Sequence, residues 1–177
     1  MQKTNAMIEA PKASDLRNDH LFAPFILGLK EMFSAEKQWV KTIPKWISAA
    51  TLCELQSALR EHLRETEGQV ARLEQAFNAL GEAPEEKSCA AMEGLLAEGC
   101  EAIKENDENS RNAAIIASAQ KVEHYEIATY GTLRAWAAAM AQEEIAELFD
   151  ETLKEEKSAD SKLTEIAGTE TPHAVEY

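Results

Sequence analysis

Helix-breaking residues and cysteines are scarce in this chain of 177 residues, which has seven glycines, five prolines and three cysteines. Long stretches are therefore free of the residues that most disfavour helix, and alanine, leucine, glutamate, lysine and glutamine fill them. The three cysteines form no Cys-x-x-Cys pair, and so small a number argues against a disulfide scaffold and for a reducing compartment.

Long apolar runs are also missing. No stretch approaches the roughly 18 apolar residues that a membrane-spanning helix needs, and the first residues lack the apolar core of a secretion signal. We therefore expect a cytoplasmic protein with no membrane partner.

Positive charge is in the minority. The 18 Lys and Arg residues are outnumbered by 32 Asp and Glu residues, which gives a net charge of −14 and a pI near 4.7. A chain this acidic repels phosphate backbones, so we expect no nucleic-acid partner. Acidity suits cation binding, but most acidic proteins simply solvate their charge.

Apolar residues recur at helical spacing in four long segments. The first should begin near Asn18-Asp19, where either residue can cap a helix, and Pro44 should kink it or end its regular part. A second helix follows a break near Ala50-Thr51 and should end at Gly81.

The second half of the chain predicts two more long helices. They should cover about residues 109–139 and 143–167, with Gly168 as the C-cap of the last one. Residues 81–107 read as a long crossover that carries a short amphipathic helix of its own.

The four long helices are joined in chain order by a short, a long and a short connection. This order predicts an all-α fold, a four-helix bundle with one crossover. The long connection lets the second and third helices run parallel, while the other sequential pairs form antiparallel hairpins. We expect the bundle to span residues 18–168, with a flexible N-terminal arm (1–17) and a flexible C-terminal tail (169–177).

Charged residues interrupt the apolar stripes near the middle of each helix. The clearest stripe reads Ile116-Ala119-Glu123-Glu126-Tyr130-Leu133, with spacings of three and four residues that mark one helix face. Mid-helix positions meet at one level in an antiparallel bundle, so these side chains should converge. The interrupting residues are Glu36, His62, Glu65, Glu123, Glu126, Glu156 and Asp160.

Six acids in one apolar volume carry a formal charge of about −6, which cannot persist without partners. Two bound cations would offset most of it, so we predict a metal site with these seven residues as candidate ligands. Because at most one nitrogen faces inward, the set favours hard ions such as manganese or iron over zinc or copper.

Three further residues are candidates for contacting the ligands rather than the metal: Gln69, Tyr130 and His124. Tyr130 follows Glu126 by one turn and can donate its hydroxyl to a ligand carboxylate. His124 points about 100° away from Glu123 around the helix, so it cannot share the site easily. Two alternatives stay open. His62 could equally be a metal ligand or a histidine packed in the core, and the acids could be solvated on the helix surfaces.

Several longer motifs, taken in order, resemble the YciE/YciF family of bacterial stress proteins, over roughly residues 20–167. The resemblance implies a ferritin-like, rubrerythrin-related bundle that is usually dimeric. The matching segments are Ala35-Glu36-Lys37-Gln38, His62-Leu63-Arg64-Glu65-Thr66, Cys89-Ala90-Ala91-Met92-Glu93-Gly94-Leu95, Lys121-Val122-Glu123-His124-Tyr125-Glu126-Ile127-Ala128, Tyr130-Gly131-Thr132-Leu133 and Leu153-Lys154-Glu155-Glu156-Lys157.

Two departures separate this chain from the di-iron bundles of that superfamily. The second helix reads His-x-x-Glu, the reverse of the usual Glu-x-x-His, and the fourth offers Glu-x-x-x-Asp without histidine. They leave open whether both metal positions fill tightly.

The leading functional hypothesis is a stress-response protein with a centre of two Fe or Mn ions, acting on oxygen or peroxide by redox chemistry. A non-enzymatic dimeric bundle that binds metal or another protein is the alternative. Iron storage in a hollow shell is a third, weaker one. The sequence names no catalytic residue.

Overall fold

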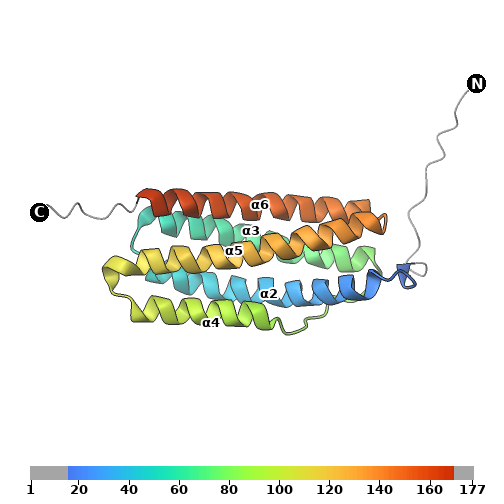
Figure 1. The fold of residues 1–177 in the computed structure, drawn as a ribbon, viewed down its shortest axis with the longest axis horizontal. Helices are drawn as coiled ribbons and strands as arrows, with labels where there is room; N and C mark the ends of the chain where they lie inside the picture. Colours follow the sequence, from blue (N-terminus) through green and yellow to red (C-terminus); the bar gives the residue numbers. More distant parts are fainter. Residues whose placement is uncertain (1–15, 170–177) are drawn as a thin grey trace, which may run out of the picture.

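The computed structural model describes residues 16–169, and within them it contains five helices and no strand. The all-α prediction is confirmed. Four long helices form a bundle and a shorter one lies outside it (Figure 1). The helices are α2 (Phe22–Ala49), α3 (Cys53–Ala79), α4 (Ala90–Glu105), α5 (Glu108–Ala139) and α6 (Glu143–Thr169).

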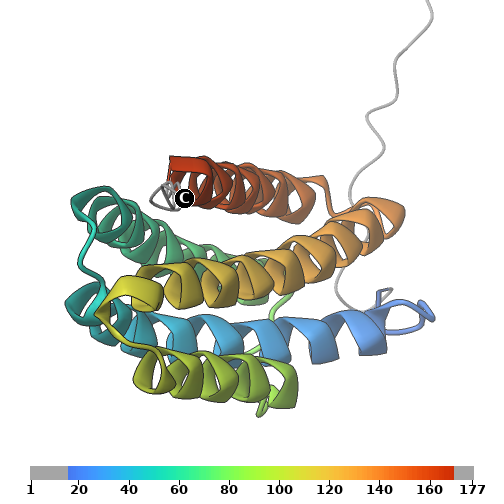
Figure 2. The ribbon, with the colours of Figure 1, turned by 60° about the vertical axis from the view of Figure 1, so that its left-hand side comes forward.

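The helix directions are those of a bundle with one crossover. Helices α2 and α3 are antiparallel, as are α5 and α6, whereas α3 and α5 run the same way (Figure 1). Around the bundle, α2 packs on α3, α3 on α6, α6 on α5, and α5 on α2, while α4 covers one side of α2 and α5 (Figure 2). This arrangement brings the middles of the four long helices to one level.

Ion pairs fasten the crossover to α2. The backbone N–H of Lys87 donates to the carbonyl of Lys30 at 3.1 Å. Lys30 pairs with Glu85 at 2.5 Å, and Lys87 pairs with Glu31 at 3.0 Å. The connecting segment is therefore held along α2 before α4 begins.

The N-terminal boundary differs from the sequence expectation. Helix α2 begins at Phe22, and Asp19 accepts a hydrogen bond from the Leu21 N–H at 2.8 Å in the turn before it. Leu16 is buried and Arg17 pairs with Glu82 at 2.9 Å, although both belong to the predicted arm. The rest of that arm, residues 1–15, lies outside the described residues.

Two expected helix ends have different outcomes. Gly81 ends α3 as predicted: its φ of +68° lies in the left-handed region, and the next N–H, that of Glu82, bonds back to the Phe77 carbonyl. Gly168 was predicted to cap the last helix, and this prediction is wrong because α6 continues to Thr169. Residues 170–177 of the predicted tail lie outside the described part of the chain.

Pro44 does not end α2, which continues to Ala49. Near the other end of α2, aromatic rings from α2, α5 and α6 pack together. Phe149 lies 6.4 Å from Phe25 and 5.5 Å from Tyr130, measured between ring centroids.

None of the helices in residues 16–169 combines the length and apolar character needed to cross a membrane.

Candidate metal centre

Five ionisable side chains from all four bundle helices are buried at one level of the bundle. Glu36, Glu126 and Glu156 are 0 % exposed, Glu123 is 1 % exposed and His62 is 4 % exposed. Each lies on the inward face of an amphipathic helix, where the three-and-four spacing places every such residue. We call these five residues the buried acid group.

Four of the five lie close enough together to share a cation. His62, Glu123, Glu126 and Glu156 each offer one ligand atom, and these atoms all lie within 4.8 Å of one another. His62 Nε2 lies 3.2 Å from Glu123 Oε1. One nitrogen and several carboxylate oxygens from three helices therefore face the same small volume.

Glu36 completes the group from α2. Its Oε1 accepts a 2.6 Å hydrogen bond from the hydroxyl of Tyr130, which is itself buried. This bond orients the carboxyl of Glu36 and leaves its Oε2 without a partner. Tyr130 thus lies where the sequence predicts it, against a candidate ligand.

Most of the buried oxygens have no hydrogen-bond partner. They are Glu36 Oε2, Glu123 Oε2, Glu156 Oε2 and both oxygens of Glu126. Unpaired buried polar atoms are rare because each costs about 1–3 kcal/mol, and more when charged. Four of the five belong to glutamates whose ligand atoms lie close together, so the donor set passes the chemical test for a metal site.

Burial and mutual repulsion both act on these acids. Burial raises the pKa of Glu36 and of Glu123 well above the ordinary value, and the charge of Glu156 raises both further. The pKa of Glu126 is raised in the same way by burial and then by Glu36 and Glu156. Without a cation, the group therefore retains protons that exposed glutamates lose.

His62 is held from two sides. The indole N–H of Trp39 donates to its Nε2 at 3.1 Å, so the ring proton belongs on Nδ1, which faces Glu65 Oε2 at 3.5 Å. Burial lowers the pKa of His62, but the hydrogen bond to Glu65 and the charges of Glu156 and Glu65 outweigh it, and the net pKa is raised. A metal at Nε2 has to displace Trp39.

Glu65 and Gln69 lie at the edge of the group. The side chain of Glu65 is 30 % exposed, so it borders the site rather than lying inside it. Gln69 is fully buried and its amide donates to Glu156 Oε1 and, at 3.1 Å, to Glu155. Gln69 therefore contacts a candidate ligand, as the sequence predicts for it.

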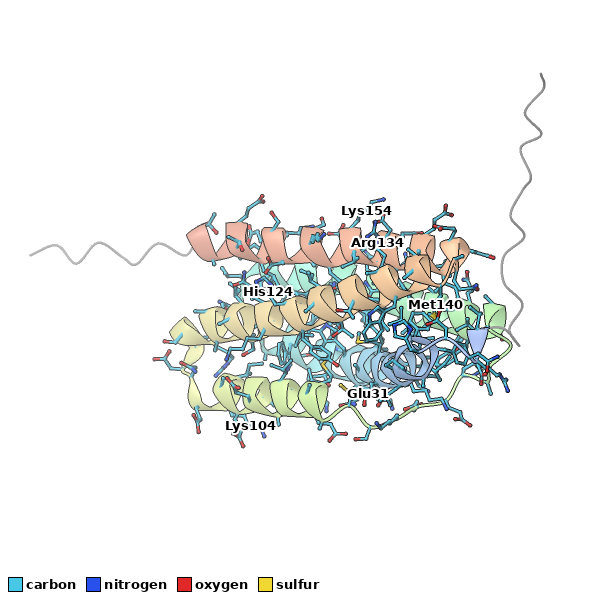
Figure 3. All side chains as sticks on the ribbon, turned by 45° about the vertical axis from the view of Figure 1, so that its right-hand side comes forward. Glu31, Lys104, His124, Arg134, Met140 and Lys154 are labelled. Carbon is cyan, nitrogen blue, oxygen red and sulfur yellow. The ribbon has the colours of Figure 1, made fainter. Side chains whose placement is uncertain are left out.

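The remaining two candidates lie outside the group. The carboxylate of Asp160 is 22 % exposed, and its Oδ1 accepts from Gln120 at 3.2 Å and lies 3.6 Å from His124 Nδ1. His124 is 68 % exposed on α5 beside α6 (Figure 3). These two residues face each other, away from the four that lie together. Their roles at a metal centre, like those of the other candidates, stay predictions.

Sequence reasoning missed Trp39 and Arg72. Trp39 follows Glu36 by three residues and Arg72 follows Gln69 by three, so both share a helix face with a named candidate. Arg72 binds both oxygens of Glu155, at 2.7 and 2.5 Å, beside the buried acid group. The spacing was the available signal in both cases.

The fold and the sequence match one family. A family model described as a domain of unknown function, DUF892, matches residues 20–176. The chain belongs to this family. It is 43 % identical to protein YciF of Escherichia coli K12 over 145 residues, which are 81 % of this chain and 87 % of that protein. The expected family resemblance is confirmed.

Solved structures agree with this assignment. The crystal structure of the E. coli stress protein YciF matches with a TM-score of 0.80 and 41 % identity over 84 % of this chain and 94 % of that one. YcfI from Rhodopseudomonas palustris matches with a TM-score of 0.77 and 40 % identity over 89 % and 96 %. A Xanthomonas campestris protein at 19 % identity and a TM-score of 0.67, over 83 % and 90 %, shares the fold. The fold is that of the ferritin-like YciF structures.

Proposed function

We propose that this chain is a stress-response protein whose buried acid group holds two Fe or Mn ions for redox chemistry on oxygen or peroxide. The observation that carries the proposal is that ligand atoms of four buried residues lie within 4.8 Å of one another and that four carboxylate oxygens of these residues have no hydrogen-bond partner. The stress context rests on the likeness to YciF, which is described as a stress protein.

The residues that would hold the ions are His62, Glu123, Glu126 and Glu156, with Glu36 at the edge. When bound, a pair of such ions supplies one-electron steps and an open position for a small oxidant. The all-helical backbone satisfies its own hydrogen bonds, so the side chains alone provide the donor atoms.

The surrounding residues orient these donors. Tyr130 fixes one oxygen of Glu36 through its hydroxyl, and Gln69 fixes one oxygen of Glu156 through its amide. Each bond leaves the other oxygen of that carboxylate available. Such supporting hydrogen bonds set the rotamers of ligands and tune their basicity.

Metal content and turnover test the proposal together. Protein purified without chelator should contain Fe or Mn and consume peroxide at a rate that scales with its metal content. Replacing Glu65 and Glu123 by Ala should remove both the metal and the turnover. Unchanged metal content in that variant contradicts the assignment.

A non-enzymatic bundle is the competing function. It is favoured by the raised pKa values of Glu36, Glu123 and Glu126, because protonated carboxyls tolerate burial without metal. Protein that is metal-free or redox-silent after reconstitution supports this alternative.

We further propose a cytoplasmic homodimer, on the family resemblance and the free thiols of Cys53, Cys89 and Cys100. Light scattering tests the assembly. A mass near two chains supports the dimer, whereas the mass of a large shell favours iron storage.

A further inference from the structure

A cavity of about 40 Å³ lies between α3 and α6 at the level of the buried acid group. Its inner wall includes His62 and Glu123, which are almost fully buried, and its outer wall includes the exposed residues Glu61, Ser158 and Lys162. The cavity therefore reaches from the surface to two members of the group.

The inner wall includes an oxygen that lacks a partner. Glu123 Oε2 is buried without a hydrogen bond, and Glu123 lines the cavity, whereas His62 Nδ1 on the same wall carries the ring proton and faces Glu65 at 3.5 Å. A buried polar atom without a partner attracts a ligand more strongly than a solvated one does. The cavity therefore leads to a carboxylate oxygen that a cation can bind.

Its size restricts what can pass. A cavity needs roughly 10–15 Å³ to hold one water, so this one has room for a few waters or a partly dehydrated ion. An organic substrate does not fit. Small side chains keep the space open, since Ala58 lines it from α3 and Ser158 and Ala159 line it from α6.

Its charge selects for cations. The lining carries the carboxylates of Glu61, Glu65 and Glu123 against a single ammonium group, that of Lys162. Lys162 pairs with Glu61 from the opposite helix, so these two charges offset each other and the carboxylates of Glu65 and Glu123 remain. A narrow cleft with acid walls raises the local concentration of cations.

We propose that this cavity is the access route by which a divalent metal ion reaches the buried acid group, with the Glu61–Lys162 pair lying across its mouth. This inference rests on the proposed metal centre. It assigns to Ser158, Ala159 and Lys162 a control over the rate of loading that is separate from the affinity of the centre.

The test is the rate at which chelator-stripped protein takes up Mn²⁺, followed by the loss of the free-ion EPR signal. Ser158→Trp should fill the mouth and slow uptake about tenfold, because entry then requires side-chain rearrangement. The final stoichiometry and affinity should stay those of the wild type. Ser161→Trp is the matched control, since Ser161 is also exposed on α6 but does not line the cavity.

A second variant changes the rate in the opposite direction. Lys162→Ala removes the positive charge and the pair at the mouth, so uptake should accelerate about threefold at low salt. Lys157→Ala, an exposed lysine of α6 away from the cavity, should leave the rate unchanged.

The outcomes separate this inference from the proposed function. Wild-type protein that takes up no Mn²⁺ contradicts the metal centre and the route with it. Normal loading in the wild type, with Ser158→Trp as fast as the wild type or slowed only as much as Ser161→Trp, overturns the route alone. Slower loading confined to Ser158→Trp supports it.

Discussion

Two neighbouring glutamates of α6 have opposite surroundings. The carboxylate of Glu155 is 20 % exposed and binds the Arg72 guanidinium through both oxygens, and Glu151 pairs with the same guanidinium at 2.9 Å. Glu156 is fully buried and accepts a hydrogen bond from the neutral amide of Gln69. We call Arg72, Glu151 and Glu155 the Arg72 cluster.

The contrast shows where the chain places its positively charged side chains. The Arg72 cluster, at the edge of the bundle, contains its counter-ion, whereas no Lys or Arg of the described residues forms a salt bridge with the buried acid group. Gln69 bonds to both Glu155 and Glu156, so the two sites are in contact. Any cation that binds at the inner site would therefore come from solution.

The largest effect is expected when the acid pair of α5, Glu123 and Glu126, is removed. The double variant Glu123→Gln and Glu126→Gln should weaken Mn²⁺ or Fe²⁺ binding at least about 100-fold, because two charged ligands become neutral. The same variant should raise the stability of the metal-free protein at pH 8 by about 1–3 kcal/mol, since it no longer buries unpaired charge.

Equilibrium urea unfolding in the presence of chelator measures the second effect. The control is Glu147→Gln with Glu165→Gln, two exposed positions of α6 outside the Arg72 cluster. A double variant of α5 that is less stable than the wild type without metal contradicts the claim that these acids are unpaired.

The pH dependence of the metal-free protein should have a definite sign. The raised pKa values of Glu36, Glu123 and Glu126 mean that the folded state binds more protons than the unfolded state, whose Glu groups titrate near about 4.3. Stability should therefore fall as the pH rises from about 4.3 through the raised folded values. His62, whose pKa is also raised, contributes a loss of the same sign above about 6.5.

Unfolding midpoints at pH 5, 6.5 and 8 with chelator check this slope. Saturating metal should reverse it, because metal competes with protons for the same carboxylates. A metal-free protein that becomes more stable between pH 5 and 8 rules the account out.

A smaller effect is expected at the Arg72 cluster, where a substitution should lower the stability of the protein rather than raise it. Arg72→Met keeps most of the apolar stem but leaves Glu155 without its partner, so the protein should lose about 1–2 kcal/mol of stability. Metal content should not change. Urea unfolding together with elemental analysis measures both, and an Arg72→Met protein that loses its metal shows that the two sites are not independent.

The smallest expected effect is at Trp39. Trp39→Phe removes the N–H that occupies His62 Nε2, so the metal no longer competes with a hydrogen bond worth about 0.5–1.5 kcal/mol, and affinity should rise a few-fold. Competition titration with a Mn²⁺ chelator measures the change. Trp46→Phe is the control, because Trp46 packs edge to face against Trp39 with centroids 4.8 Å apart and Trp39 is the residue that donates to His62.

Much of the fold could be predicted from periodicity and connection lengths. The long helices and the helical crossover follow from apolar spacing alone, and Gly81 ends α3 as glycine often does. Gly168 shows the limit of predicting helix ends from glycine, because a glycine ends a helix only where the backbone needs a left-handed residue. The turn between α5 and α6 instead uses Ala141, at a φ of +55°, which no sequence signal marks.

The site could be predicted only as a set of candidates. Shared helix faces correctly gathered Glu36, Glu123, Glu126 and Glu156, whose burial follows from the apolar stripe around them. The same spacing could not distinguish Asp160 from these buried acids, although Asp160 lies at the edge of the bundle and bonds to Gln120. Helix rotation within the bundle makes that difference, and it depends on packing between helices that the spacing along one helix does not encode.

Anomalous scattering from crystals of the Mn²⁺-loaded protein tests the central claim most directly. The account predicts anomalous peaks within the buried acid group, at bonding distance from carboxylate oxygens of Glu123, Glu126 and Glu156, and none at the Arg72 cluster. Crystals soaked in Mn²⁺ that show no peak among these residues would contradict it.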